Sequence, residues 1–357
     1  MPISLDYQVA QKILLEALAL AKSDARLPVE WRSHARAVFE LEAKTWTPAF
    51  ATLLLAKATD GNIDTMSLKA EDSNPNAYSA RGLCHKILVP AAVEHGFSIR
   101  NTGREPLNNQ PFFRYDRIDK IDRVRKPADR EYFFDFAEQA NKLTRSEALQ
   151  ALAAFLREAL AVTAAARSIV VKTSGLTADG ARIAVSDFLR FDAPDRPHRL
   201  QAFAAACLDL LYEEVKTRRI NDPSRDFPGD VHAVLGKKVA VAMEVRGKAV
   251  TPSDLTTFAK ACEAAAVSRA IMFVDAPRQI DLSLHVAVNN HFIPTTQVVA
   301  FTSAAHLLAD AFLWARLPLE TAIESFSSAF LIRLREIEVS VPTLKEWSRA
   351  VAIAQGL

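Results

Sequence analysis

The stretch NDPSRDFPGDVHAVLGKKVAVAMEVRGKAV, residues Asn221–Val250, decides how the chain is organised. It predicts two strands, Val231–Leu235 and Val239–Val245, joined by a tight turn at Gly236-Lys237-Lys238. The second strand is apolar and rich in β-branched residues until it ends in charged ones, which is typical of a central, buried strand. We therefore expect a hairpin at the centre of a sheet.

Acidic and basic side chains gather at one end of this predicted hairpin. Side chains alternate between the two faces of a strand, so Glu244, Arg246 and Lys248 share one face. If the two strands pair, Asp230 lies beside Glu244, and two such carboxylates repel each other unless a cation lies between them. Carboxylate oxygens suit Mg²⁺, and a nearby cationic side chain can meet the charge that develops in phosphoryl transfer. The residues predict a magnesium site.

Three blocks of the sequence carry a resemblance. The run PGD, followed after a turn by EVRGK, resembles the PD-(D/E)xK nuclease core. The longer blocks ARGLCHKILVPAAVEHGFSIRNTGREPLNNQPFFR, RRINDPSRDFPGDV and MEVRGKAVTPSDL resemble the SacI family of type II restriction endonucleases. The resemblance implies a Mg²⁺-dependent enzyme that hydrolyses double-stranded DNA at a short palindrome, GAGCTC for the family's namesake. It also implies a homodimer, because each protomer then faces one half-site, and a cognate methyltransferase.

The resemblance also implies roles for residues at the hairpin. Asp230 and Glu244, with the Val245 carbonyl as a further ligand, would hold the metal ion. The motif has a lysine two residues after its second acidic residue, where this chain has Arg246, and Lys248 follows. Either Arg246 takes the place of that lysine, or the side chain of Lys248 extends back towards the site and takes over its role. Since arginine does not give up a proton, a general-base role falls only to Lys248.

The segment before the hairpin contains further candidates. A helix is predicted at Arg199–Thr217. In nucleases of this fold a glutamate on that helix often orders metal or water, so Glu213 or Glu214 is a candidate, against the alternative of a solvated helix end. Arg219 and Arg225 follow and are candidates for phosphate contacts, which position DNA without reading it.

Residues 71–130 form a second candidate region. Between Arg81 and Arg130 there are eleven Lys and Arg against six Asp and Glu. Arginine bonds guanine, whereas asparagine and glutamine bond adenine. Charge alone favours a solvated loop with local ion pairs, and the resemblance favours DNA recognition. The candidate contacts are Arg81, Arg100, Arg104, Asn108, Asn109, Gln110 and Arg114, with Phe112, Phe113 and Tyr115 available to wedge between or stack on bases.

Composition sets the fold class. The chain has 357 residues and a net charge of +2, so no global basic field indicates nucleic acid. Glycine is scarce, with 10 residues, which favours helices over a β-sandwich. We predict an α/β protein with a mixed sheet flanked by helices. The nuclease core is expected in residues 166–357, after a mostly helical region in residues 1–165.

Several elements outside the hairpin are predicted by their periodicity and end signals. The expected elements are a helix at Ala80–His95 ending at Gly96, strands at Ser168–Thr173, Ala270–Val274 and Gln297–Thr302, and a helix at Asp281–His291. A further helix is expected to begin at a cap formed by Thr251 or Ser253.

Other signals are weak or absent. Cys84, Cys207 and Cys262 show no zinc or disulfide spacing, which points to a reducing, cytoplasmic setting. The N-terminus has no cationic n-region, and no uncharged stretch is long enough to span a membrane. Walker, GxGxxG and HExxH motifs are absent. His232 lies two residues after Asp230 and could contact a metal ion. A single histidine near the end of a strand is more often a polar neighbour of the site than a metal ligand.

Three alternatives stay open. A nuclease of the same fold with another defence or repair role differs in its cleavage pattern. A DNA-binding relative that lost catalysis, which the departure at Arg246 keeps open, binds without cutting in Mg²⁺. A helical scaffold protein has no salt-dependent affinity for DNA.

Overall fold

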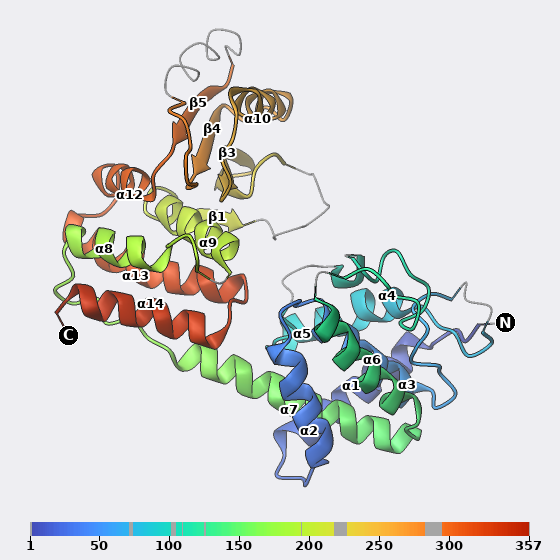
Figure 1. Cartoon of the computed structure of the whole chain (residues 1–357). Helices are drawn as coiled ribbons and strands as arrows, with labels where there is room; N and C mark the ends of the chain where they lie inside the picture. Colours follow the sequence, from blue (N-terminus) through green and yellow to red (C-terminus); the bar gives the residue numbers. More distant parts are fainter. Residues whose placement is uncertain are drawn as a thin grey trace. The chain divides into compact units, whose positions relative to one another are not determined.

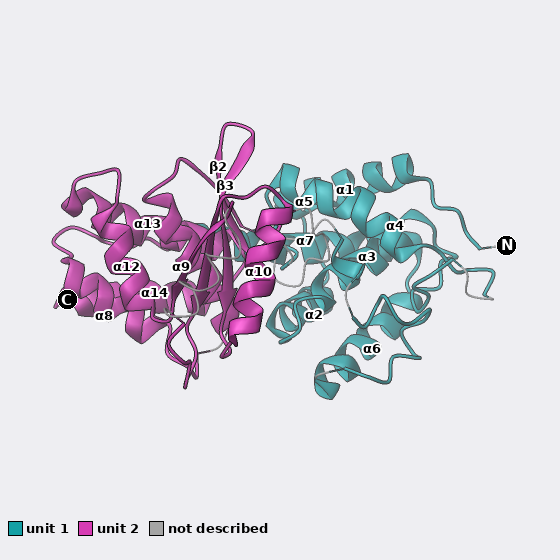
Figure 2. Cartoon of the chain, turned by 90° about the horizontal axis from the view of Figure 1, so that it is seen from above, with its two compact units in different colours: residues 1–167 teal, residues 168–357 magenta. Residues whose placement is uncertain are grey.

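The computed structural model describes residues 2–70, 74–100, 105–108, 110–124, 126–193, 195–217, 227–282 and 295–356. The chain divides into two compact units, Met1–Arg167 and Ser168–Leu357 (Figure 2). This division falls close to the boundary expected from the sequence.

The first unit is helical. Its described elements are, in chain order, α1 (Tyr7–Lys22), α2 (Val29–Glu40), α3 (Trp46–Thr59), α4 (Ala80–Leu83), the π-helical turn η1 (Cys84–Leu88), α5 (Val89–His95), the 3₁₀ turn η2 (Pro106–Asn108), α6 (Pro127–Asn141) and α7 (Arg145–Ser168) (Figure 1). The helix predicted at Ala80–His95 is therefore continuous but contains a π-helical turn. Gly96 follows it in a left-handed conformation, as its predicted capping role requires.

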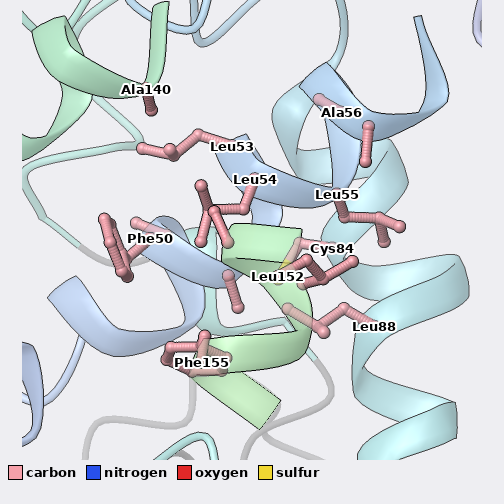
Figure 3. Packing of buried hydrophobic residues seen from close by; sticks show 14 of the residues in the cluster. Phe50, Leu53, Leu54, Leu55, Ala56, Cys84, Leu88, Ala140, Leu152 and Phe155 are labelled. Carbon is pink, nitrogen blue, oxygen red and sulfur yellow. The ribbon is translucent and has the colours of Figure 1, made fainter. Parts of the chain in front are cut away.

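Helix α3 forms the centre of the first unit, because all of its residues are buried. Figure 3 shows Phe50 and Leu54 of α3 beside Leu152 and Phe155 of α7. A helix that is apolar all round belongs inside a core. Among the described helices, α7 is long and apolar enough to cross a membrane by length and composition alone, but half of its apolar window is buried in the protein. Its packing is that of a core helix.

The second unit combines helices with one sheet. Its described elements are α8 (Ala178–Phe188), α9 (Arg196–Asp209), β1 (Glu214–Thr217), β2 (Val231–Leu235), β3 (Lys238–Arg246), α10 (Pro252–Ala264), β4 (Arg269–Val274), β5 (Gln297–Phe301), α12 (Ala304–Leu313), α13 (Leu319–Glu336) and α14 (Val341–Ala354).

The sheet is mixed, as the sequence predicts. Its order is β1-β2-β3-β4-β5, with β1, β2 and β3 antiparallel and β3, β4 and β5 parallel. Helix α10 covers one face, where Leu255 packs in a cluster with Ala242 of β3. Helix α9 covers the other face, where Phe203 contacts Phe273 of β4 with ring centroids 5.6 Å apart (Figures 1 and 2). Both faces are thus covered, which explains the apolar strands.

The hairpin is confirmed. Leu235 pairs with Lys238, so Gly236 and Lys237 alone make the turn between β2 and β3. Strands β4 and β5 also lie where they were predicted. The cap of α10 is Thr251, which forms a reciprocal capping box with Asp254.

Two element predictions are wrong. The helix predicted at Arg199–Thr217 ends at Asp209, and Glu214–Thr217 forms β1 instead. Val215 is buried there while Glu214 is exposed, and pairing with β2 satisfies the backbone, so tertiary contacts override helix propensity. The predicted strand Ser168–Thr173 is not formed: α7 continues to Ser168, and residues 169–173, which the structure describes, have no strand assignment. The helix predicted at Asp281–His291 lies mostly outside the described residues.

Candidate active site and nucleic-acid interface

The candidate active site lies where β2 begins and β3 ends. The last pair of the ladder between β2 and β3 is Val231 with Met243. Asp230 precedes Val231 and Glu244 follows Met243, so both candidates flank this last pair. Since Ala242 packs against α10, Glu244 lies on the α10 side of the sheet.

The carboxylate of Asp230 reaches the peptide bond that follows Glu244. Its Oδ2 accepts the backbone N–H of Val245 at 2.9 Å. The backbone N–H of Asp230 donates to the Met243 carbonyl at 2.8 Å. These two bonds extend the contact between the strands beyond the end of β2. The structure thereby brings Asp230, Glu244 and the main chain of Val245 together.

Three residues hold the turn that presents Asp230. Gly229 has φ +93°, and a Cβ there would lie 2.9 Å from the Met243 carbonyl oxygen, so only glycine fits. His232 is buried, and its Nε2 donates to the Pro228 carbonyl at 2.7 Å. This contact ties the His232 side chain to the turn that precedes Asp230.

Gln201 of α9 is a site residue that sequence reasoning missed. Its side chain is 3% exposed, and its Nε2 donates to the Asp230 carbonyl at 3.1 Å. The signal was available, because Gln201 is a polar residue inside the apolar run RLQAFAAACLDL. A buried amide needs a partner, and that partner is the main chain of the catalytic candidate.

Glu244 forms an ion pair with Arg246 on the same face of the strand. The Glu244 side chain is 14% exposed and that of Arg246 is 53% exposed, so the pair lies at the rim of the sheet. Burial, together with the charge of Glu244, raises the pKa of the Cys262 thiol to about 12. Cys262 belongs to α10, which agrees with the face assigned to Glu244.

The end of β3 is tied to α9 and β4. The buried Arg196 of α9 donates to the Asp275 main-chain carbonyl at 2.9 Å and lies 3.2 Å from the Asp275 carboxylate. Asp275 in turn donates its N–H to the Arg246 carbonyl at 3.0 Å. Burial raises the pKa of Asp275, against the opposing effect of Arg196. Lys248 follows just beyond this anchored end and is exposed.

The donors at this end of the sheet fit a magnesium ion. Within the residues that the structure describes, no three His, Cys, Asp or Glu side chains cluster closely enough for a metal ion. Mg²⁺ needs fewer, since proteins bind it through one or two carboxylates while it keeps waters or phosphate oxygens. Asp230 and Glu244 supply two carboxylates, and Val245 supplies a main-chain oxygen beside them.

Glu214 does not belong to this cluster. It pairs with Val234, near the opposite end of β2 from Asp230, which corresponds to about 13 Å along a strand. Its exposed side chain contacts Lys216 at 2.8 Å. Glu213 contacts Arg316 at 3.2 Å instead. The candidates Arg219 and Arg225 lie outside the described residues.

In the first unit, two predicted DNA contacts serve packing instead. Arg100 donates to the carbonyls of Val38 and Leu41, at 3.2 and 2.6 Å, and so caps the end of α2. Phe112 is 1% exposed and packs against Trp46 and Phe133, so it is not placed to enter DNA.

The remaining predicted contacts of this unit differ in exposure. Gln110, Phe113 and Arg114 are exposed. Tyr115 donates its hydroxyl to Asp122. Arg81 and Asn108 line a surface hollow of about 500 Å³ together with Ser79, Gly82, His85, Lys86 and Glu105. The candidates Arg104 and Asn109 lie outside the described residues.

Comparison with known proteins gives two matches. Residues 9–164 match the N-terminal domain of SacI restriction endonucleases, which corresponds to the first unit. The whole chain is 35% identical, over 358 aligned positions, to the type II restriction enzyme SacI of Streptomyces achromogenes. That alignment covers 98% of each protein, so it includes both units.

Proposed function

Because the chain belongs to the SacI family of type II restriction endonucleases, we propose that it cuts double-stranded DNA at a short palindrome with Mg²⁺ as cofactor. The resemblance of the motif blocks supports GAGCTC as the target. The observation that carries the proposal is the contact of the Asp230 carboxylate with the peptide bond after Glu244. It supports a PD-(D/E)xK type of site at this end of the sheet.

Asp230 and Glu244, with the carbonyl of Val245, would hold the magnesium ion. A bound Mg²⁺ supplies an activated water and offsets negative charge on the phosphate. Gln201 and Gly229 keep Asp230 beside β3. A metal ion at Glu244 would compete with the Arg246 guanidinium, which contacts one oxygen of that carboxylate.

Lys248 and Arg246 would have different roles in the reaction, one at the attacking water and the other at the phosphate. In hydrolysis the water oxygen bonds to phosphorus and loses a proton, the bond from phosphorus to the leaving oxygen breaks, and the leaving oxygen takes up a proton from solvent. Lys248 orients the attacking water and is the one of the two cations that can act as a general base, since arginine does not give up its proton. Arg246, once released from Glu244, turns its guanidinium to the phosphate, whose oxygens it can bind bidentately.

The proposed function also implies an oligomeric state, a partner enzyme and a cellular compartment. Cutting both strands of a palindrome calls for a homodimer with two-fold symmetry. A methyltransferase that modifies the same sequence would protect the host's own DNA. Cys84, Cys207 and Cys262 are free and buried, which supports a reducing, cytoplasmic setting.

One observation favours a second candidate function. The ion pair between Glu244 and Arg246 already neutralises a carboxylate that the metal needs. If the pair persisted on DNA, the protein would bind its target without cutting it. We keep a catalytically inactive DNA-binding relative as the alternative.

Cleavage mapping tests these proposals together. The purified chain is incubated with two plasmids, one with a single GAGCTC and one with that site altered, in Mg²⁺, Ca²⁺ or EDTA. Mg²⁺-dependent linearisation of the first plasmid alone supports the proposal, and run-off sequencing locates the ends. Cutting elsewhere points to another nuclease role. Binding without cutting supports the inactive relative, and no binding to either plasmid rules out both.

A further inference from the structure

The hollow in the first unit lies between the helix that starts at Ser79 and the short segment Glu105–Asn108. Three side chains in its lining are joined in series by hydrogen bonds. Arg81 donates to the Asn108 Oδ1 at 3.4 Å, and the Asn108 Nδ2 donates to the Glu105 carboxylate. The amide of Asn108 thus bonds at both ends. It holds a guanidinium and a carboxylate at a fixed spacing and is not placed to read a base itself.

Both cations of the hollow lie over aromatic rings. The Arg81 guanidinium lies 5.8 Å from the Phe113 ring centroid, and the Lys86 ammonium lies 5.3 Å from that of Tyr7. A Cβ at Gly82 would collide with the Tyr7 hydroxyl, so this glycine allows Tyr7 to pack there. Arg81 contacts Asn108 and Phe113, and Lys86 contacts Tyr7. The two cations are thus positioned by neutral partners.

The helix that carries these residues is distorted at the hollow. Val89 donates its N–H to the Cys84 carbonyl, which defines the π-helical turn η1. Pro90 explains the distortion, because its ring clashes with the carbonyl four residues earlier. Such turns inside α-helices often occur at functional sites. Here the turn contains His85 and Lys86, which both line the hollow.

The charges of the lining indicate what the hollow binds. Arg81 and Lys86 are donors suited to the N7 and O6 acceptors of guanine, and Glu105 is an acceptor suited to the amino group of cytosine. His85 adds no positive charge at neutral pH, since burial lowers its pKa and its Nε2 accepts the Leu107 N–H at 3.3 Å. A carboxylate in the lining disfavours a phosphate and favours a base pair that offers both acceptors and a donor.

We propose that this hollow reads one G·C pair of the target in the major groove. Arg81, with Lys86 beside it, donates to guanine, and Glu105 accepts from cytosine. Asn108 is a positioning residue that sets the spacing between the two contacts. The inference rests on the proposed function, because it assigns part of the sequence recognition to named side chains.

The test measures binding in Ca²⁺ to duplexes in which one guanine at a time is replaced by 7-deazaguanine, which lacks the N7 acceptor. Arg81→Ala should weaken binding to the unmodified target about tenfold or more. On a duplex with 7-deazaguanine at the contacted position, Arg81→Ala should weaken binding almost no further. The reason is that the altered base and the altered side chain each remove the same contact, the one between Arg81 and guanine N7. Glu105→Ala should lose its effect when the cytosine of that pair is replaced by 2-pyrimidinone, which lacks the amino group.

Two variants keep the result interpretable. Arg26→Ala removes an exposed arginine of the same unit outside the hollow, and its effect should be equal on all duplexes. Arg81→Lys keeps the charge but not the bidentate geometry, so it should relax the preference at one base pair without changing the salt dependence. If Arg81→Ala weakens every duplex equally and lowers the salt dependence, the hollow contacts phosphates and the proposal is wrong. That outcome leaves the endonuclease proposal intact, whereas absence of DNA binding by the unaltered protein would remove both.

Discussion

The two polar sites of this protein are held in place by different kinds of contact. In the second unit, Asp230 is fixed by main-chain bonds to β3 and by Gln201 on the carbonyl of Asp230 itself. In the first unit, Arg81 and Glu105 are joined through the side chain of Asn108. Metal-assisted hydrolysis tolerates little displacement of its groups, and a backbone ladder provides that rigidity. Reading a base edge tolerates longer and more adaptable side chains.

The largest expected effect tests the chemical role of the second unit. Asp230→Asn and Glu244→Gln each remove a carboxylate charge needed to hold the metal, so cleavage should fall by about 10³-fold or more. Binding to the target in Ca²⁺ should stay within a few-fold, because the hollow of the first unit is untouched. Plasmid cleavage rates and fluorescence anisotropy measure the two effects. Full activity in either variant would remove the site assignment.

A smaller expected loss of cleavage rate distinguishes whether Lys248 or Arg246 takes the role of the lysine in the motif. Lys248→Ala should slow cleavage about 10²-fold, the usual cost of removing a group that stabilises charge in the transition state. Arg246→Ala should cost less, since Arg246 is proposed to contact the phosphate only and, unlike Lys248, cannot accept the proton of the water. Single-turnover rates in Mg²⁺ compare the two variants directly. The reverse order would transfer the lysine role to Arg246.

The units can also be compared through two carboxylates that each bond two arginines, the buried Glu158 and the half-buried Glu346. Glu346 in the second unit bonds Arg199 and Arg190, and hydrogen bonds from these arginines hold its pKa below the usual value despite burial. In the first unit, Glu158 bonds Arg36 and Arg32; burial raises its pKa, but the arginines outweigh this and lower it. Each carboxylate links elements that are distant in sequence.

Replacing these carboxylates should destabilise each unit in a pH-dependent way. Glu346→Gln and Glu158→Gln should each lower the free energy of unfolding by about 2 kcal/mol at neutral pH. A depressed folded-state pKa adds stability above the unfolded value, near 4.3, and this stability is lost as the pH falls through the folded-state value. The variants should therefore approach the unaltered protein in acid, which urea unfolding measures when it is followed from pH 7 down to about 3, below the unfolded-state value. Glu324→Gln, an exposed position on α13, is the control and should change nothing.

The smallest expected effect concerns the helix that covers the face carrying Glu244. Thr251→Ala removes the capping box of α10 and should cost about 1 kcal/mol. Thermal unfolding should show a lower melting temperature for this variant, with DNA binding in Ca²⁺ unchanged. Ser253→Ala is the matched control, because the structure gives the cap to Thr251. If the two variants lower the melting temperature equally, Thr251 is not the cap of α10.

The sequence was sufficient where the signals were local. The apolar run with its two-residue turn specified β2 and β3, and the cap signal specified the start of α10. Asp230 and Glu244 could be proposed as neighbours because pairing of the two predicted strands brings the start of one beside the end of the other. The long helix predicted through Glu214 was wrong because its propensity signal did not include the partner strand. Gln201 was missed because its role depends on α9 lying against the turn before β2.

What the sequence determined by itself is the chemical inventory: the family, the mixed α/β architecture, and two acidic residues at the ends of neighbouring strands. Only the tertiary structure decided which polar residues work together. It assigned Arg100 to the end of α2, Phe112 to the core, and Asn108 to a link between Arg81 and Glu105. The physical reason is that side chains such as Arg and Asn satisfy their hydrogen bonds with whichever groups the fold brings near. The partners of Arg100 at the end of α2 and the contact of Asn108 with Arg81 are distant in sequence, and no local pattern contains them.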